Sequence, residues 1–118
     1  MLGKLGDSAR LRHIFDAIIE IEIYLTNTSL EEFNDNSMAR FATVKQLEII
    51  GEASKHLSEE IKLRFSAVEW KQIIGMRNVL VHEYFGIDNR LIWQIIKEEL
   101  PDLKEKIKEI IDAMNQKG

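Results

Sequence analysis

The sequence predicts an all-α fold, an antiparallel bundle of four to five helices. Apolar residues recur at three- and four-residue steps along most of the 118-residue chain, which is the helical period. Pro101 is the single proline and the six glycines are scattered, so the chain has too little turn punctuation for an all-β domain of this size. The length is that of one domain, and we expect residues 1–118 to form it.

The first predicted helix begins near Asp7 or Ser8, because either side chain can cap a helix start. Its apolar stripe continues to Leu25. Ile19 and Ile23 add apolar surface outside that stripe. This excess indicates burial on two sides, by the core and by another subunit, so we expect a homodimer.

A polar connection with a short turn at residues 30–33 leads to the second long helix, for which Ser37 can provide the cap. Gly51 lies inside this helix, where glycine costs about 1 kcal/mol relative to alanine. Close approach of a neighbouring helix would explain its presence. The residues expected on the buried face are Phe41, Val44, Leu47, Ile50, Ala53 and Leu57.

A short helix is expected over residues 58–65, followed by a longer one over 68–85 that Gly86 would end. Residues 79–81 are β-branched or leucine and would also suit a buried strand. We favour a helix there, because the upstream pattern is helical and no partner strand is evident.

The last helix begins near Asp88 or Asn89 and carries one long apolar stripe as far as Met114. Pro101 lies inside it. Because proline lacks the amide proton and its ring clashes with the preceding turn, we expect a kink or a division into two helices.

Composition excludes several classes of protein. The chain has no cysteine, so it has no disulfide, zinc-ribbon, iron–sulfur or thiol-nucleophile chemistry. The net charge of −4 argues against broad, nonspecific nucleic-acid binding, although a small site for one phosphodiester stays open. The chain has no apolar run of membrane-spanning length and no signal-peptide core, so we expect a cytoplasmic protein without a membrane partner.

The strongest cluster of functional groups lies at residues 77–84, where Arg77, Asn78, His82 and Tyr84 are embedded in apolar sequence. A guanidinium can stabilise the charge of a phosphodiester transition state, and an imidazole can transfer protons near neutral pH. Asn78 can hydrogen-bond a phosphate oxygen. On a helix, His82 lies about 140° around the axis from Arg77, a span that a long arginine can reach across.

The same residues also have a structural interpretation, as the end of a helix. His82 would then stabilise the last turn through the helix dipole, Arg77 would pair with an acid, and Tyr84 would pack against the core. Spacing alone does not separate this alternative from a catalytic site.

Other candidates have simpler structural explanations. His13 and Asp16 lie one helical turn apart, but no third metal ligand is evident, so we expect no metal site. His56 is expected to be a charge at a helix C-terminus. Trp70 and Trp93 are expected to be core anchors.

Residues 77–84 resemble the R-x4-H-x-Y motif of HEPN domains, and in particular that of the HepT-like toxin family. The likeness extends over nearly the whole chain. It includes residues 10–14, 46–53, 70–76, 84–88, 91–93 and 99–101.

This resemblance implies a homodimeric HEPN bundle that acts as a metal-independent, cofactor-free endoribonuclease. Arg77 and His82 carry over as catalytic residues and Asn78 as a supporting one. The protein would be the toxin of a type VII toxin–antitoxin pair, with RNA as substrate. Its antitoxin would be a nucleotidyltransferase of the MntA type, which transfers AMP to Tyr84.

The chemistry that the resemblance implies favours a dimer. Cleavage can use the 2′-hydroxyl of the RNA as nucleophile, but attack and departure call for both a base and an acid. Two facing motifs would supply two histidines and two arginines in one composite cleft on a two-fold axis. The alternatives are a noncatalytic HEPN module that binds a nucleotide or a nucleotidyltransferase, and a purely structural helical dimer.

Overall fold

The structure, a computed structural model, describes the backbone of residues 2–83 and 88–116 and the side chains of residues 6–82 and 88–116. These residues form helices and connections without a strand, so residues 79–81 are helical. The elements in chain order are α1 (Leu2–Tyr24), α2 (Leu30–Asp35), α3 (Ser37–Lys55), α4 (Glu59–Arg64), α5 (Trp70–Glu83), α6 (Asn89–Gln94), the π-helical segment η2 (Ile95–Glu99) and α7 (Leu100–Asn115).

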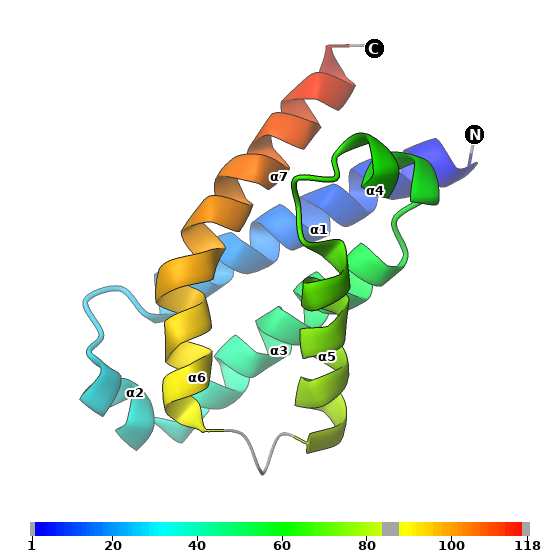
Figure 1. The fold of residues 1–118 in the computed structure, drawn as a ribbon. Helices are drawn as coiled ribbons and strands as arrows, with labels where there is room; N and C mark the ends of the chain where they lie inside the picture. Colours follow the sequence, from blue (N-terminus) through cyan, green and yellow to red (C-terminus); the bar gives the residue numbers. More distant parts are fainter. Residues whose placement is uncertain (1, 84–87, 117–118) are drawn as a thin grey trace.

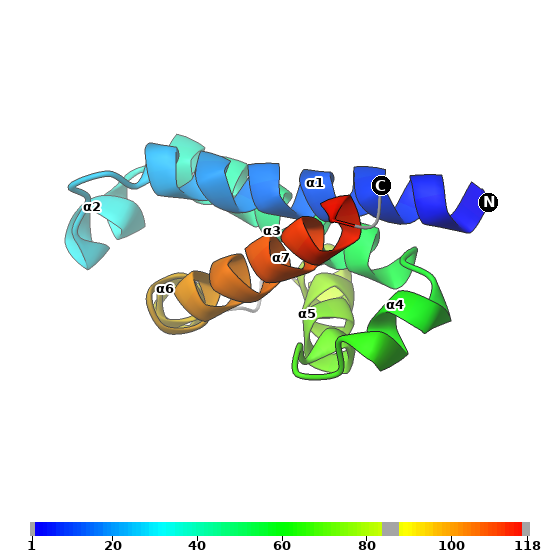
Figure 2. The ribbon, with the colours of Figure 1, turned by 90° about the horizontal axis from the view of Figure 1, so that it is seen from above.

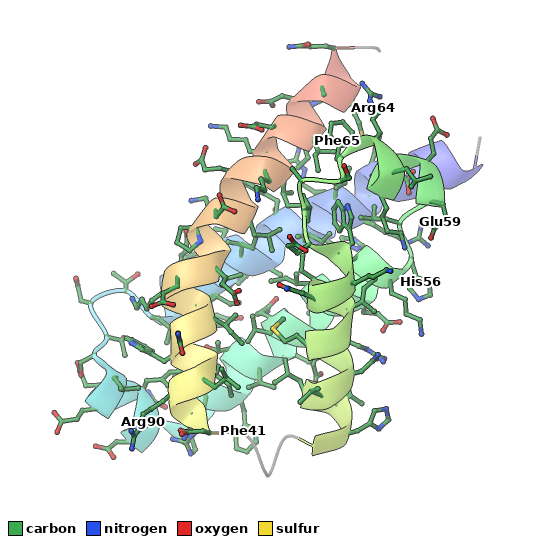
Figure 3. The ribbon with its side chains drawn as sticks, in the orientation of Figure 1. Phe41, His56, Glu59, Arg64, Phe65 and Arg90 are labelled. Carbon is green, nitrogen blue, oxygen red and sulfur yellow. The ribbon has the colours of Figure 1, made fainter. Side chains whose placement is uncertain are left out.

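The helices form two layers. α1 and α3 run antiparallel in one layer, and α5 and the α6–α7 arm lie across them in the other (Figures 1 and 2). The predicted core residues Val44, Leu47, Ile50, Ala53 and Leu57 are buried between the layers. Phe41 differs from the prediction, because 55% of its surface is exposed. It lies near the start of α3 (Figure 3).

Side-chain caps set most helix starts. Ser58 caps α4 and Asp88 caps α6, so both helices begin where the sequence predicted a helix start. The cap of α3 is Asn36, whose Oδ1 accepts from the Ala39 amide at 3.0 Å, so the prediction of Ser37 was one residue too late. The expected turn after residue 29 is a full short helix, α2, which Ser29 and Glu32 close with a reciprocal capping box.

α1 begins at Leu2, five residues before the predicted cap at Asp7. Asp7 has another role, because its carboxylate is buried and accepts from the Ser58 amide at 2.8 Å and from Ser58 Oγ at 2.6 Å. This contact fixes the start of α4 to the first turns of α1. Sequence reasoning could not find it, since the two residues are distant along the chain.

Pro101 divides the C-terminal helix, as predicted. Leu100 donates its amide to Ile95 O, five residues back, so the chain passes through a π-helical segment immediately before the proline. The wider turn accommodates the proline ring and its missing donor. None of the helices that the structure describes combines the length and apolar character that crossing a bilayer requires.

Candidate active site at the crossing of α3 and α5

α3 and α5 cross at Gly51, and the crossing is very close. A Cβ atom at Gly51 would lie 2.1 Å from Arg77 Cβ and 3.2 Å from Ile73 O. Only a residue without a side chain fits there, which confirms the predicted reason for a glycine inside this helix. The close contact sets the base of the Arg77 side chain directly on α3.

Arg77 is held by two neighbours. Its Nη2 lies 2.8 Å from Glu52 Oε2, and its Nη1 donates to Asn78 Oδ1 at 3.0 Å. Glu52 Oε2 is buried and has no aligned hydrogen bond, so the contact with Arg77 is an ion pair. The pairing with an acid is what the structural interpretation of Arg77 predicted, and it also fixes the position of the guanidinium.

Glu52 connects Arg77 to a histidine. Its second oxygen, Oε1, lies 2.9 Å from His56 Nε2 one helical turn further along α3. The hydrogen bond with His56 is the largest influence and lowers the pKa of Glu52 below its ordinary value. Desolvation raises the pKa by less than this, and the positive charge of Arg77 adds to the lowering. His56 is the C-cap residue of α3, as expected, and it lies at the end of that helix in Figure 3.

His82 has different surroundings. It lies in the last turn of α5, is exposed, and makes no hydrogen bond or ion pair within the part of the chain that the structure describes. Val79 and Val81, three residues and one residue before it, are each 44% exposed. A single chain therefore does not bring Arg77 and His82 together, although both lie on α5.

The remaining predicted residues are Asn78 and Tyr84 of the motif and the two tryptophans. Asn78 is exposed and hydrogen-bonds Arg77, whereas Tyr84 lies outside the described residues. Trp70 is buried, and its indole donates to Phe65 O at 3.1 Å, so it is a core anchor. Trp93 is partly buried and packs against the Phe33 ring, with 5.3 Å between ring centroids.

His13 does not form a metal site with Asp16. Among the described residues no group of three or more histidine, aspartate or glutamate side chains could hold a metal ion. His13 instead lines a groove between α1 and α3 together with Glu52 and His56.

Glu52 is the residue that sequence reasoning missed. Its signal was the glycine before it, because a glycine inside a helix marks the crossing point of a second helix. The neighbour of such a glycine can reach that second helix with its side chain. The identity of the partner, Arg77, was not readable from spacing.

Residues 14–110 match the family model described as "Ribonuclease HepT-like". The chain belongs to the HepT-like family. This confirms the resemblance stated from the motif at residues 77–84.

Relatives of similar length support the same assignment of this HepT-like chain. "Putative RNase MJ1380" of Methanocaldococcus jannaschii is 37% identical over 106 residues, which are 90% of this chain and 97% of the relative. "Putative RNase TTE0752" of Caldanaerobacter subterraneus is 42% identical over 101 residues, 86% of this chain and 90% of the relative. "Probable ribonuclease HepT" of Thermococcus cleftensis is 37% identical over 100 residues, which are 85% of this chain and 91% of the relative. No solved structure was found to match the chain.

Proposed function

We propose that this protein is a metal-independent RNA endonuclease and the cytoplasmic toxin of a type VII toxin–antitoxin pair. The proposal rests on the two functional groups that helix α5 of this HepT-like chain carries. They are the guanidinium of Arg77, which is held in place, and the exposed imidazole of His82. Asn78 supports the guanidinium through its hydrogen bond. The names of its relatives point to the same substrate class, RNA.

In the proposed reaction the nucleophile is the 2′-hydroxyl next to the scissile phosphate. Neutral His82 removes the 2′ proton as the 2′-oxygen attacks phosphorus, and the bond from phosphorus to the 5′-oxygen breaks. A protonated second histidine donates its proton to that leaving oxygen. The products are a 2′,3′-cyclic phosphate and a 5′-hydroxyl, and Arg77 stabilises the charge that develops on the phosphoryl oxygens.

The second histidine would come from a second copy of the chain. The exposed end of α5 carries His82 and, just before it, the half-exposed Val79 and Val81, a surface that a two-fold partner could cover. Ile23 of α1, predicted to face another subunit, is 62% exposed in the single chain. Sedimentation at micromolar concentration should give about twice the mass of one chain, and a monomer there would argue against the composite site.

The decisive test is RNA cleavage by the wild-type protein and by His82→Ala, with and without EDTA. Removing a proton-transfer group commonly costs about a hundredfold or more in rate, so His82→Ala should be inactive while its helical circular dichroism is unchanged. Full cleavage by folded His82→Ala would refute the catalytic assignment. Loss of wild-type cleavage in EDTA would refute the metal-independent mechanism.

The antitoxin in this proposal is an MntA-type nucleotidyltransferase that transfers AMP to the hydroxyl of Tyr84. Tyr84 is two residues from His82 in the sequence, so an added phosphate would compete with RNA for Arg77 and obstruct the site. Coexpression should add about 329 Da per unit to the intact mass and abolish cleavage. Tyr84→Phe should stay unmodified and active, and silencing of Tyr84→Phe by the same partner would contradict the modification model.

One observation favours a second candidate, a noncatalytic module that binds a nucleotide or a nucleotidyltransferase. Arg77 is already neutralised by Glu52, and His82 is not in contact with it. In this alternative, the wild-type chain binds RNA or nucleotide but does not cleave, and His82→Ala behaves like the wild type in the assay above.

A further inference from the structure

A groove of about 350 Å³ lies between α1 and α3, on the outer side of the first helix layer. Gly6, Arg10 and His13 of α1 form one wall, and Glu52 and His56 of α3 form the other. Glu52 belongs both to this groove and to the Arg77 ion pair. The groove and the candidate active site are therefore neighbours that share one carboxylate.

Arg10 supplies an unpaired positive charge to the groove. Its side chain is partly buried and folds back along α1, so that a Cβ at Gly6 would lie only 2.4 Å from Arg10 Nη1. Within the described part of the chain, the Arg10 guanidinium has no hydrogen bond and no ion pair. A partly buried cation without a counter-charge favours the binding of an anion.

Glu52 does not neutralise Arg10, although both line the groove. One Glu52 oxygen is engaged by His56 and the other by Arg77. The Glu52 charge is therefore matched by Arg77 on the α5 side, and the Arg10 charge remains. His13 adds a ring nitrogen that can donate a hydrogen bond from the α1 wall, whereas His56 on the α3 wall already has its Nε2 engaged by Glu52.

Phosphate is the anion that fits this set of groups. A guanidinium presents a planar fork of donors that matches two phosphate oxygens, and an imidazole adds a single donor. A nucleic acid strand presents one such phosphate at each nucleotide. A strand whose scissile phosphate lies at Arg77 could place a neighbouring phosphate in the groove beyond Glu52.

We propose that the groove between α1 and α3 binds a phosphate of the RNA strand that flanks the scissile phosphate, with Arg10 as its main ligand. This rests on the proposed ribonuclease function and gives that function a second contact with the substrate. The contact would set the position of the strand, and it is separate from the proton transfer at His82.

The test measures binding of a fluorescein-labelled single-stranded oligoribonucleotide by fluorescence polarisation, with every protein carrying His82→Ala so that the RNA stays intact. Arg10→Ala should weaken binding about tenfold, as expected for a lost charge-assisted hydrogen bond. It should also reduce the slope of log affinity against log salt by roughly 0.7, the value for one phosphate contact on a single strand.

Arg12→Ala is the matched control. Arg12 is two residues further along α1, about 200° around the helix, exposed, and outside the groove. Both variants remove one positive charge from the chain, so a general electrostatic effect would be equal in the two. Equal affinities for Arg10→Ala and Arg12→Ala would overturn the inference.

Gly6→Leu gives a second variant that keeps every charge. A leucine would occupy the place of the Arg10 guanidinium, yet it should favour the helix over glycine. We expect weaker RNA binding by a protein at least as stable as its parent. Unchanged RNA affinity in folded Gly6→Leu would contradict the groove site.

Two further outcomes separate the possible failures. If the His82→Ala parent binds no RNA, the proposed function fails and the inference fails with it. If Arg10→Ala loses affinity for 5′-AMP but keeps that for RNA, the groove is a mononucleotide site. In that case the strand inference is overturned while the ribonuclease proposal stands.

Discussion

Arg77 and His82 are only five residues apart on α5, yet their surroundings are opposite. Arg77 lies at the crossing with α3, where Glu52 and Asn78 hold its guanidinium. His82 lies at the open end of the helix, exposed and without a hydrogen bond among the described residues. One half of the candidate site is thus organised within a single chain, whereas the other half is left for a contact from outside it.

Helix geometry accounts for this difference. Five residues correspond to about 140° of rotation, so when Arg77 faces α3, His82 must face away from it. No rotamer of either side chain changes the direction of its Cα–Cβ bond. If both groups act on one phosphodiester, the missing partner has to approach the outer face of α5, and a second copy of the chain can do so.

The largest expected effect tests whether the two halves come from different chains. Arg77→Ala and His82→Ala should each lose about a hundredfold or more in RNA cleavage. Mixing the two variants under conditions that exchange subunits should restore about tenfold, but not the full rate. The mixed dimer regains one arginine and one histidine in the shared cleft, yet it lacks the second histidine that would act as the acid.

A mixture as inactive as its components would show that one arginine and one histidine on different chains do not make a working site. The control is a mixture without subunit exchange, which should stay inactive. Cleavage of labelled RNA, followed by gel electrophoresis, provides the measurement.

The second prediction concerns the crossing itself. Gly51→Ala places a Cβ against Arg77 Cβ and Ile73 O, atoms that cannot move without shifting α5. We expect a loss of about 1–3 kcal/mol in the free energy of unfolding, as for overpacked cores, together with loss of cleavage. Urea denaturation, monitored by circular dichroism, measures this free energy of unfolding.

Gly75→Ala is the matched control. Gly75 lies on an exposed face of α5, the other helix of the crossing. A Cβ at Gly75 meets nothing within 4 Å. This substitution should stabilise the protein by about 0.5–1 kcal/mol, the usual gain of alanine over glycine inside a helix. If Gly51→Ala were as stable as Gly75→Ala, the close approach at Arg77 would be wrong.

The smallest effect concerns the carboxylate that holds Arg77. Glu52→Gln should reduce kcat about threefold to tenfold with little change in KM, because it frees a charge-stabilising group without removing it. Glu48→Gln is the control, since among the described residues the one ion pair of Glu48 is with Lys45, at 3.9 Å on the same helix. Equal kinetics for the two variants would show that Glu52 does not position Arg77.

The same variant has a defined pH signature. The hydrogen bond with His56 and the charge of Arg77 lower the pKa of Glu52 in the folded state. Such a group stabilises the fold above its unfolded pKa, and this contribution is lost as pH falls through the folded value. Acid unfolding of Glu52→Gln should therefore show a weaker dependence on pH in the carboxylate range than that of the wild type. An identical dependence would contradict the ion pair.

Much of the candidate site was predictable as a set of residues but not as an arrangement. The cluster at residues 77–84 was recognisable because polar groups interrupt an apolar pattern. The helical period allowed a long arginine to reach across to His82, and only the structure shows that the Arg77 guanidinium is held by Glu52 and Asn78 instead. Tyr84 lies outside the described residues. The partners of Arg77 across the crossing, and the groove beside it, were not predictable because their residues belong to three different helices.

The sequence by itself determined the features that depend on short-range contacts. Helical period, the helix starts at Ser58 and Asp88 and the interruption before Pro101 each follow from interactions within about one or two turns of chain. Only the tertiary structure decided that Asp7 binds Ser58, that Phe41 is half exposed, and that Glu52 joins Arg77 to His56. Those contacts depend on where the helices cross, and a crossing is set by the packing of whole helix surfaces, which one local segment does not encode.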